Sequence, residues 1–102
     1  MARQTKTNGG GAMYITLKAY LENVETFERS RPEGQRRHVP SLRELARDVG
    51  IHEVTLNNIA NNNIQQLNLG TGAKIITALR RRGFKMDVGD MIAYRPPEEI
   101  EG

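Results

Sequence analysis

Apolar residues recur at helical spacing along most of the chain, and breaks in this pattern divide it into elements. The predicted helices span residues 14–29, 42–49, 53–61, 69–82 and 88–94. In the first helix, apolar side chains three or four residues apart form one stripe: Leu17, Tyr20, Leu21, Val24 and Phe27. Five such helices predict an all-α fold, a compact bundle in which each helix buries one stripe.

The segments outside these helices are polar or rich in helix-breaking residues. Residues 1–12 end in three glycines, and we expect a disordered arm there, either native, or a leader or expression remnant. Pro32, Gly34 and Pro40 predict a surface loop over residues 30–40. The acidic residues 96–102 are expected to form a flexible tail, so that a single domain occupies residues 13–95.

The stretch "LRELARDVGIHEVTLNNIA", residues 42–60, contains a glycine where the helical pattern is otherwise strong. Glycine within a helix costs about 1 kcal/mol relative to alanine, so Gly50 marks a steep turn that needs positive φ. Ala46 is small enough to lie beneath a second helix that buries Leu56 and Ile59. An ordinary glycine-capped hairpin remains the alternative, but the combination favours the helix-turn-helix of DNA-binding proteins.

Side chains at the ends of these helices indicate where each begins and stops. "SLRE" at residues 41–44 is a capping box, in which Ser41 and Glu44 each bond the other's backbone amide. The asparagines at 61–63 stop the second motif helix, since asparagine tolerates the left-handed conformation. Asn68 caps the next helix, in which Leu69, Ile75, Ile76 and Leu79 are expected to point inward.

Composition excludes several classes of protein and adds a polyanion to the expected partners. The 102 residues include no cysteine, which excludes disulfides and thiolate metal sites and fits a cytoplasmic location. No apolar run is long enough to span a membrane. The net charge of +3 is clustered: six arginines accompany two acids over residues 29–47, and five basic residues accompany none over 74–85. Either cluster alone is most simply interpreted as solvated surface. Because both flank the proposed motif, together they favour a polyanionic partner.

Residues 41–94 resemble the Cro-like, phage-repressor type of helix-turn-helix, the xenobiotic-response-element family of transcriptional regulators. The resemblance rests on "LRELARDVGIHEVTLNNIANNN", "IQQLNLGTGAKIITAL" and "VGDMIAY". It implies a five-helix all-α domain that binds duplex DNA, usually as a dimer paired near residues 88–94. The chain departs from the family in its long loop at 30–40, in His52 at the recognition-helix cap, in Asn62 where glycine is usual, and in the added "RRRGFKM".

The expected base-reading residues follow from helical geometry at about 100° per residue. If Leu56 centres the buried face of the second motif helix, the opposite face enters the major groove with Glu53, Val54, Asn57 and Asn58. Asn57 or Asn58 suits a bidentate contact to adenine, and Val54 suits a thymine methyl group. Glu53 either accepts from a cytosine amino group or simply stabilises the positive helix N-terminus.

The expected contacts to the DNA backbone come from residues around this helix, namely Arg43, Arg47, His52, Thr55, Asn61, Arg36 and Arg37. Arg43 and Arg47 lie on the outer face of the first motif helix, and the resemblance places Asn61 at a position where the family contacts phosphate. Arg36, Arg37 and His38 on the loop are equally compatible with a purely solvated role. Arg3 and Lys6 on the arm offer a further contact along a groove.

Catalysis and cofactors are not expected. "GTGAK" at residues 70–74 lacks the Gly-Lys-Ser/Thr ending of a phosphate loop, and the two histidines have no partners at metal-ligand spacing. No nucleophile with a base and an orienting acid is recognisable. Two functions remain: a homodimeric DNA-binding repressor that occupies an operator, or an antitoxin-like subunit whose tail and loop hold a protein partner.

Overall fold

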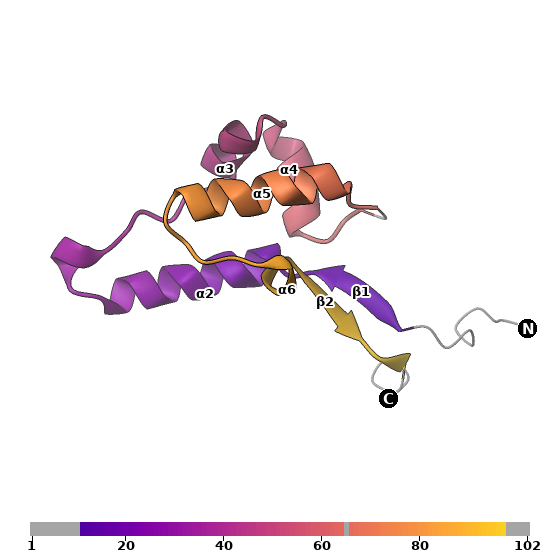
Figure 1. The fold of residues 1–102 in the computed structure, drawn as a ribbon, viewed down its shortest axis with the longest axis horizontal. Coiled ribbons are helices and arrows are strands. Elements are labelled where there is room, and N and C mark those ends of the chain that lie inside the picture. The colour runs from indigo at the N-terminus through magenta and orange to yellow at the C-terminus, as the bar shows by residue number, and fades with distance from the viewer. Residues whose placement is uncertain (1–10, 65, 98–102) are drawn as a thin grey trace, which may run out of the picture.

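The computed structural model describes residues 11–64 and 66–97, and they form five α-helices and a two-stranded sheet. In chain order the elements are β1 (Ala12–Ile15), α2 (Leu17–Ser30), the 3-10 turn η1 (Glu33–Gln35), α3 (Leu42–Val49), α4 (Glu53–Ala60), α5 (Leu69–Arg81), α6 (Val88–Met91) and β2 (Ile92–Arg95). Figure 1 shows α3, α4 and α5 grouped above α2, while β1 and β2 project together as a ribbon from one end. The described fold is therefore mostly helical.

The prediction of a purely all-α fold is wrong at both ends of the domain. Residues 14 and 15, expected to begin a helix, lie in β1, and residues 92–94, expected to end one, lie in β2. The two strands pair antiparallel, from Ala12 opposite Arg95 to Ile15 opposite Ile92. Tyrosine and isoleucine favour strands, but only a partner far along the chain reveals the pairing, and local periodicity contains no sign of it.

The predicted flexible segments lie largely outside the described residues. The arm was expected to reach residue 12, but Ala12 belongs to β1, so the strand begins earlier than the domain boundary placed at 13. Residues 1–10 and 98–102 lie outside the part that the structure describes. The loop at 30–40 is present, with η1 as a short turn within it.

The core draws on every α-helix and on the link between α5 and α6. Its buried apolar members are Leu17, Leu45, Ala46, Val49, Leu56, Ile59, Ala60, Ile75, Leu79, Phe84, Met86 and Met91. Asn68 caps α5 as predicted, accepting from the Thr71 amide at 3.1 Å. Within this core α3 packs against α5, and α4 packs against α3 and α2, so the two short helices hold one orientation.

Two residues that were expected to point inward are exposed. Phe27 is 60% exposed, because the last turns of α2 extend beyond the helices above it (Figure 1). Leu69 is 85% exposed, because it is the first residue of α5 and precedes the turn that meets the core. The apolar stripe of α2 therefore continues in the sequence beyond the part of the helix that packs against the core.

A buried carboxylate organises the return of the chain from α2 to α3. Glu28 is buried at the end of α2 and accepts from the Arg37 backbone amide at 2.7 Å and from the Arg31 guanidinium at 3.3 Å. The Arg37 amide lowers the pKa of Glu28, against the opposing effect of burial. The Glu28 carboxylate therefore binds the loop both near its start, at Arg31, and near its end, at Arg37.

Candidate nucleic-acid interface

The turn into α3 is held by the predicted capping box. The Ser41 hydroxyl accepts from the Glu44 amide at 3.1 Å, and the Glu44 carboxylate accepts from the Ser41 amide at 2.9 Å. The His38 ring nitrogen Nε2 lies 2.8 Å from the same carboxylate oxygen. The Ser41 amide, followed by His38, lowers the pKa of Glu44 to about 2. His38 is therefore tied to the start of α3, a link that the sequence did not reveal.

Gly50 joins α3 to α4 in the predicted left-handed conformation. Its φ is +86°, and its amide donates to the Ala46 carbonyl at 2.8 Å. The Ile51 amide donates to the same carbonyl at 3.0 Å, so the chain leaves α3 at once. Ala46 is buried between the helices, in agreement with the expected need for a small side chain there. The motif thus has the predicted two short helices, joined by a glycine in the left-handed conformation.

One face of α4 is buried and the opposite face is open to solvent. Leu56, Ile59 and Ala60 lie in the core, whereas Val54 is 70% exposed and Asn58 is exposed beside it. Asn57 is half-buried at the border between the two faces. The helix ends at Ala60, one residue before the predicted end, and Asn62 takes the left-handed conformation with a φ of +61°. Val54 and Asn58 therefore lie on a face of α4 that the core does not use, with Asn57 at its border.

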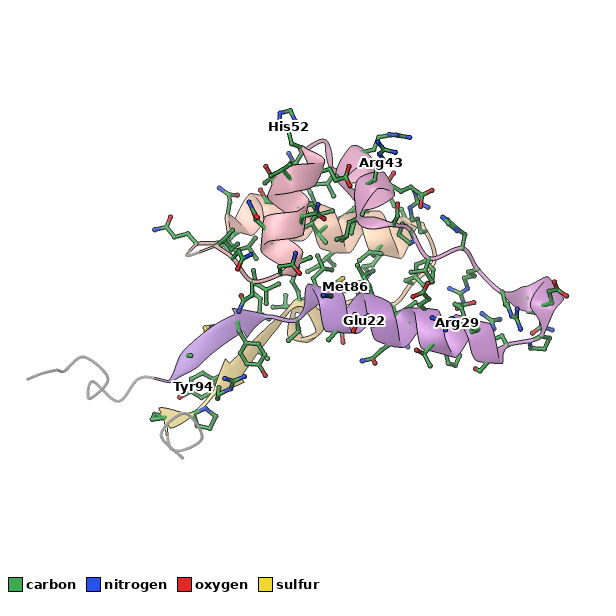
Figure 2. All side chains as sticks on the ribbon, turned by 180° about the vertical axis from the view of Figure 1, so that it is seen from behind. Glu22, Arg29, Arg43, His52, Met86 and Tyr94 are labelled. Carbon is green, nitrogen blue, oxygen red and sulfur yellow. The ribbon has the colours of Figure 1, made fainter. Side chains whose placement is uncertain are left out.

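Arg43 and His52 lie at the same extremity of the molecule, where α3 and α4 meet (Figure 2). The Nε atom of Arg43 is 3.6 Å from Oε1 of Glu53, the first residue of α4. His52 occupies the N-cap position without a side-chain capping bond, and its ring is exposed. The structure thus brings Arg43, an expected phosphate contact, next to Glu53, an expected base contact. The sequence did not indicate this pair, because ten residues separate its members.

The other expected contacts on α3 and α4 differ in how firmly they are held. Arg47 and Thr55 are exposed on the last turn of α3 and the first turn of α4. The Asn61 side-chain amide donates to the Asn57 carbonyl at 2.9 Å, which fixes it against the end of α4. This bond uses one of the two N–H donors of the amide, so Asn61 keeps its second N–H and its amide oxygen for other contacts.

Arg36 and Arg37 are engaged away from the α3–α4 surface. Arg36 Nε donates to the Arg31 carbonyl at 2.9 Å, within the loop itself. The Arg37 guanidinium donates to the Gly83 carbonyl and lies 5.7 Å from the centre of the Phe84 ring. Their predicted contact with the DNA backbone stays a prediction, and these bonds give Arg37 a role in fixing the loop to the α5–α6 link.

An ion pair that the sequence did not reveal joins α3 to the end of α5. Arg82 Nε donates to Asp48 Oδ2 at 2.6 Å, and this bond raises the pKa of Arg82. Part of the second basic cluster is therefore neutralised by α3. Alternation of charge along the sequence could not indicate the pair, because 34 residues separate its members.

The segment 88–94, near which two copies were expected to pair, contains the apolar residues Val88, Met91, Ile92 and Tyr94, and two of these are exposed. Met91 is buried and Ile92 is partly buried in the chain's own core, while Val88 and Tyr94 are exposed.

Within residues 11–64 and 66–97 no three potential metal ligands come together. None of the helices described there has both the length and the apolar character needed to cross a bilayer. Comparison of the chain with family models, curated proteins and solved structures returned no match.

Proposed function

We propose that this protein binds double-stranded DNA sequence-specifically and represses transcription in the cytoplasm by occupying an operator. The observation that carries the proposal is the open face of α4, where Val54 and Asn58 stand on a helix whose other face is fixed in the core. The major groove of DNA admits one α-helix, and the first residues of a recognition helix face the base edges. Under this proposal the protein acts by binding alone, without a cofactor.

The charges around α4 support a polyanionic partner. Arg43 and Arg47 are exposed on α3, which in helix-turn-helix proteins crosses the phosphate backbone. His52 and Thr55 lie at the leading end of α4, within reach of the same strand under this geometry. Phosphate contacts of this kind position the protein, while Glu53, Val54, Asn57 and Asn58 supply the sequence preference.

We further propose a homodimer that binds two half-sites separated by about 34 Å, one turn of DNA. Such spacing makes the operator a near-palindrome. Each copy then contributes one α4 and one set of backbone contacts, which multiplies the affinity and the specificity of a small domain.

A protein partner is the second candidate, and one surface feature favours it. A groove of about 540 Å³ lies between α2 and the α5–α6 link, beside the exposed Phe27. Exposed aromatic residues next to a groove are common at protein interfaces. An antitoxin-like subunit would use such a surface in addition to α4, or in its place.

One assay separates the two candidates. The full chain is used to enrich duplexes from a randomised library, and fluorescence anisotropy compares an enriched duplex with its shuffled version. We expect the enriched duplex to bind about 10³-fold or more tightly at physiological salt. Equal affinity for both duplexes, or selective binding only after a second protein is added, would favour the interaction module instead.

A further inference from the structure

The two edges of the β1–β2 ribbon can be assigned from the hydrogen bonds at its base. The Ile15 amide donates to Asn62 Oδ1 at 3.1 Å, and the Thr16 amide donates to the Met91 carbonyl at 2.7 Å. Ile15 therefore directs its backbone groups away from β2. Because this direction alternates along a strand, the amide and carbonyl of Met13, two residues earlier, face the same outer edge.

An apolar groove of about 270 Å³ lies between the ribbon and the segment that begins at Asn62, the residue at this outer edge. Met13, Tyr14, Ile15 and Ile92 from the ribbon line it together with Asn62, Ile64, Gln66 and Leu67. Near Ile15 the edge is occupied by the Asn62 side chain, whereas among residues 11–64 and 66–97 the outward backbone groups of Met13 have no recorded hydrogen bond. Met13 stands at this open end with 69% of its surface exposed. An unpaired strand edge beside a groove is the geometry to which a further strand adds.

We propose that the outer edge of β1 pairs with the same edge of a second copy of this chain, about a two-fold axis at Met13. In that arrangement each Met13 amide donates to the Met13 carbonyl of the other copy, and the two ribbons lie in one four-stranded antiparallel sheet. The Ile15 amide keeps its bond to Asn62, so the reciprocal Met13 bonds carry the contact between the copies. The assignment builds on the homodimer in the proposed function, and it replaces the exposed part of residues 88–94 as the contact.

Self-complementarity argues for a second copy and against a foreign peptide. The same edge presents an exposed, flexible methionine and an apolar groove, so a two-fold contact places each Met13 against the groove of the other copy. A ribbon of two four-residue strands is also marginal by itself, and pairing it with another gives the strand number that stable sheets have.

The position of the ribbon relative to α4 is consistent with this axis. Figure 1 shows the ribbon and α4 towards the same end of the molecule, with η1 at the other end. An axis through the ribbon therefore lies at the end of the molecule opposite η1, and the two η1 turns are far apart in the dimer. Four-residue strands give an interface smaller than the about 1,200 Å² of a standard stable one. We expect a dimer that dissociates in the micromolar range.

Sedimentation equilibrium of the full chain without DNA tests the assignment. The wild type should move from 11.5 kDa towards twice that mass as its concentration rises into the high micromolar range. Met13→Pro removes an outward amide and leaves the β1–β2 bonds intact, so it should raise the dimer dissociation constant about tenfold or more. Tyr94→Pro removes the equivalent amide from the edge of β2 and should leave the dissociation constant unchanged.

A second pair of variants guards against a failure to fold. Met13→Lys and Tyr94→Lys change residues that face each other in the ladder. Only Met13→Lys sets two like charges together across the proposed axis, so it alone should abolish the dimer, with circular dichroism unchanged for both. A mass that stays at 11.5 kDa in the wild type, or dimers that respond to Tyr94 and not to Met13, would overturn the assignment. A dimer that binds no DNA would instead overturn the proposed function alone.

Discussion

The Nε atom of Arg43 lies 3.6 Å from Oε1 of Glu53, so the outer face of α3 and the first residue of α4 form an ion pair across the turn. Both side chains are largely exposed, and such pairs are worth at most about 1 kcal/mol. A phosphate can therefore replace Glu53 as the partner of Arg43 at little cost. Under the proposed function, Glu53 would then lie close to the DNA as an unpaired negative charge unless it accepts from a base.

This relationship predicts the effect of Glu53→Gln. Removing the charge should tighten binding to unrelated duplexes about two- to fivefold, because Arg43 no longer has to give up its ion pair with Glu53 to bind a phosphate. The matched control is Glu25→Gln, which breaks the Glu25–Arg29 pair of 3.4 Å on α2 and should change nothing. Anisotropy titrations of the three proteins on a shuffled duplex measure this. Weaker binding by Glu53→Gln to every duplex would contradict the assigned position of Glu53.

The salt dependence of binding tests the assigned backbone contacts. If a dimer contacts about six to ten phosphates, log Kobs should fall with log salt with a slope of about −5 to −9. Arg47→Ala should reduce the magnitude of this slope by about 1 for each phosphate that is no longer neutralised, on any sequence. Arg29→Ala is the control, because Arg29 lies on α2, away from the end that carries Arg43 (Figure 2). Equal slopes for all three proteins would remove Arg47 from the interface.

Gly50 provides a test of the turn that is independent of DNA. A Cβ at this position would have no atom within 4 Å, so any cost of substitution comes from the φ of +86° and not from a clash. Gly50→Val should lower the free energy of unfolding by about 1–3 kcal/mol. Gly34→Val, in open space on η1, should change it by less than about 0.5 kcal/mol. Urea unfolding followed by circular dichroism compares them, and equal stability of the two variants would mean that a branched side chain is not strained at position 50.

The capping box predicts an acid-sensitive step in stability. Its hydrogen bonds lower the pKa of Glu44 from 4.5 to about 2, so the box stabilises the fold above about pH 5. This contribution is lost as the pH falls from about 5 towards 2, because the unfolded chain takes up the proton first. Glu44→Gln should lower the melting temperature near neutral pH and flatten its decline with acid. Melting curves that stay parallel in both proteins would show that the box does not govern the decline.

Local chemistry made part of this fold predictable from the sequence. Ser41 with Glu44, Gly50, and Asn68 act through residues at most four positions away, and each occupies the conformation or bond expected. The buried face of α4 followed in the same way from helical periodicity. These are the features that define the candidate interface.

The remainder depends on partners far along the chain. The β1–β2 pairing joins Ile15 to Ile92, and the Asp48–Arg82 pair spans two helices, so neither leaves a periodic trace. Glu28 resembles any exposed helix acid in the sequence, yet the returning loop buries it. The Arg43–Glu53 pair required the crossing angle of α3 and α4, which the sequence implies only as a steep turn.

Binding-site selection with the wild type, Val54→Ala and Asn58→Ala tests the central claim, that the open face of α4 reads DNA, most directly. Both side chains lie outside the core, so the variants should fold normally. Asn58→Ala should cost about 1–3 kcal/mol on the preferred site and relax the preference at one base pair per half-site, and Val54→Ala should relax a neighbouring thymine. If all three proteins select the same motif with the same strength, this face of α4 does not contact the bases.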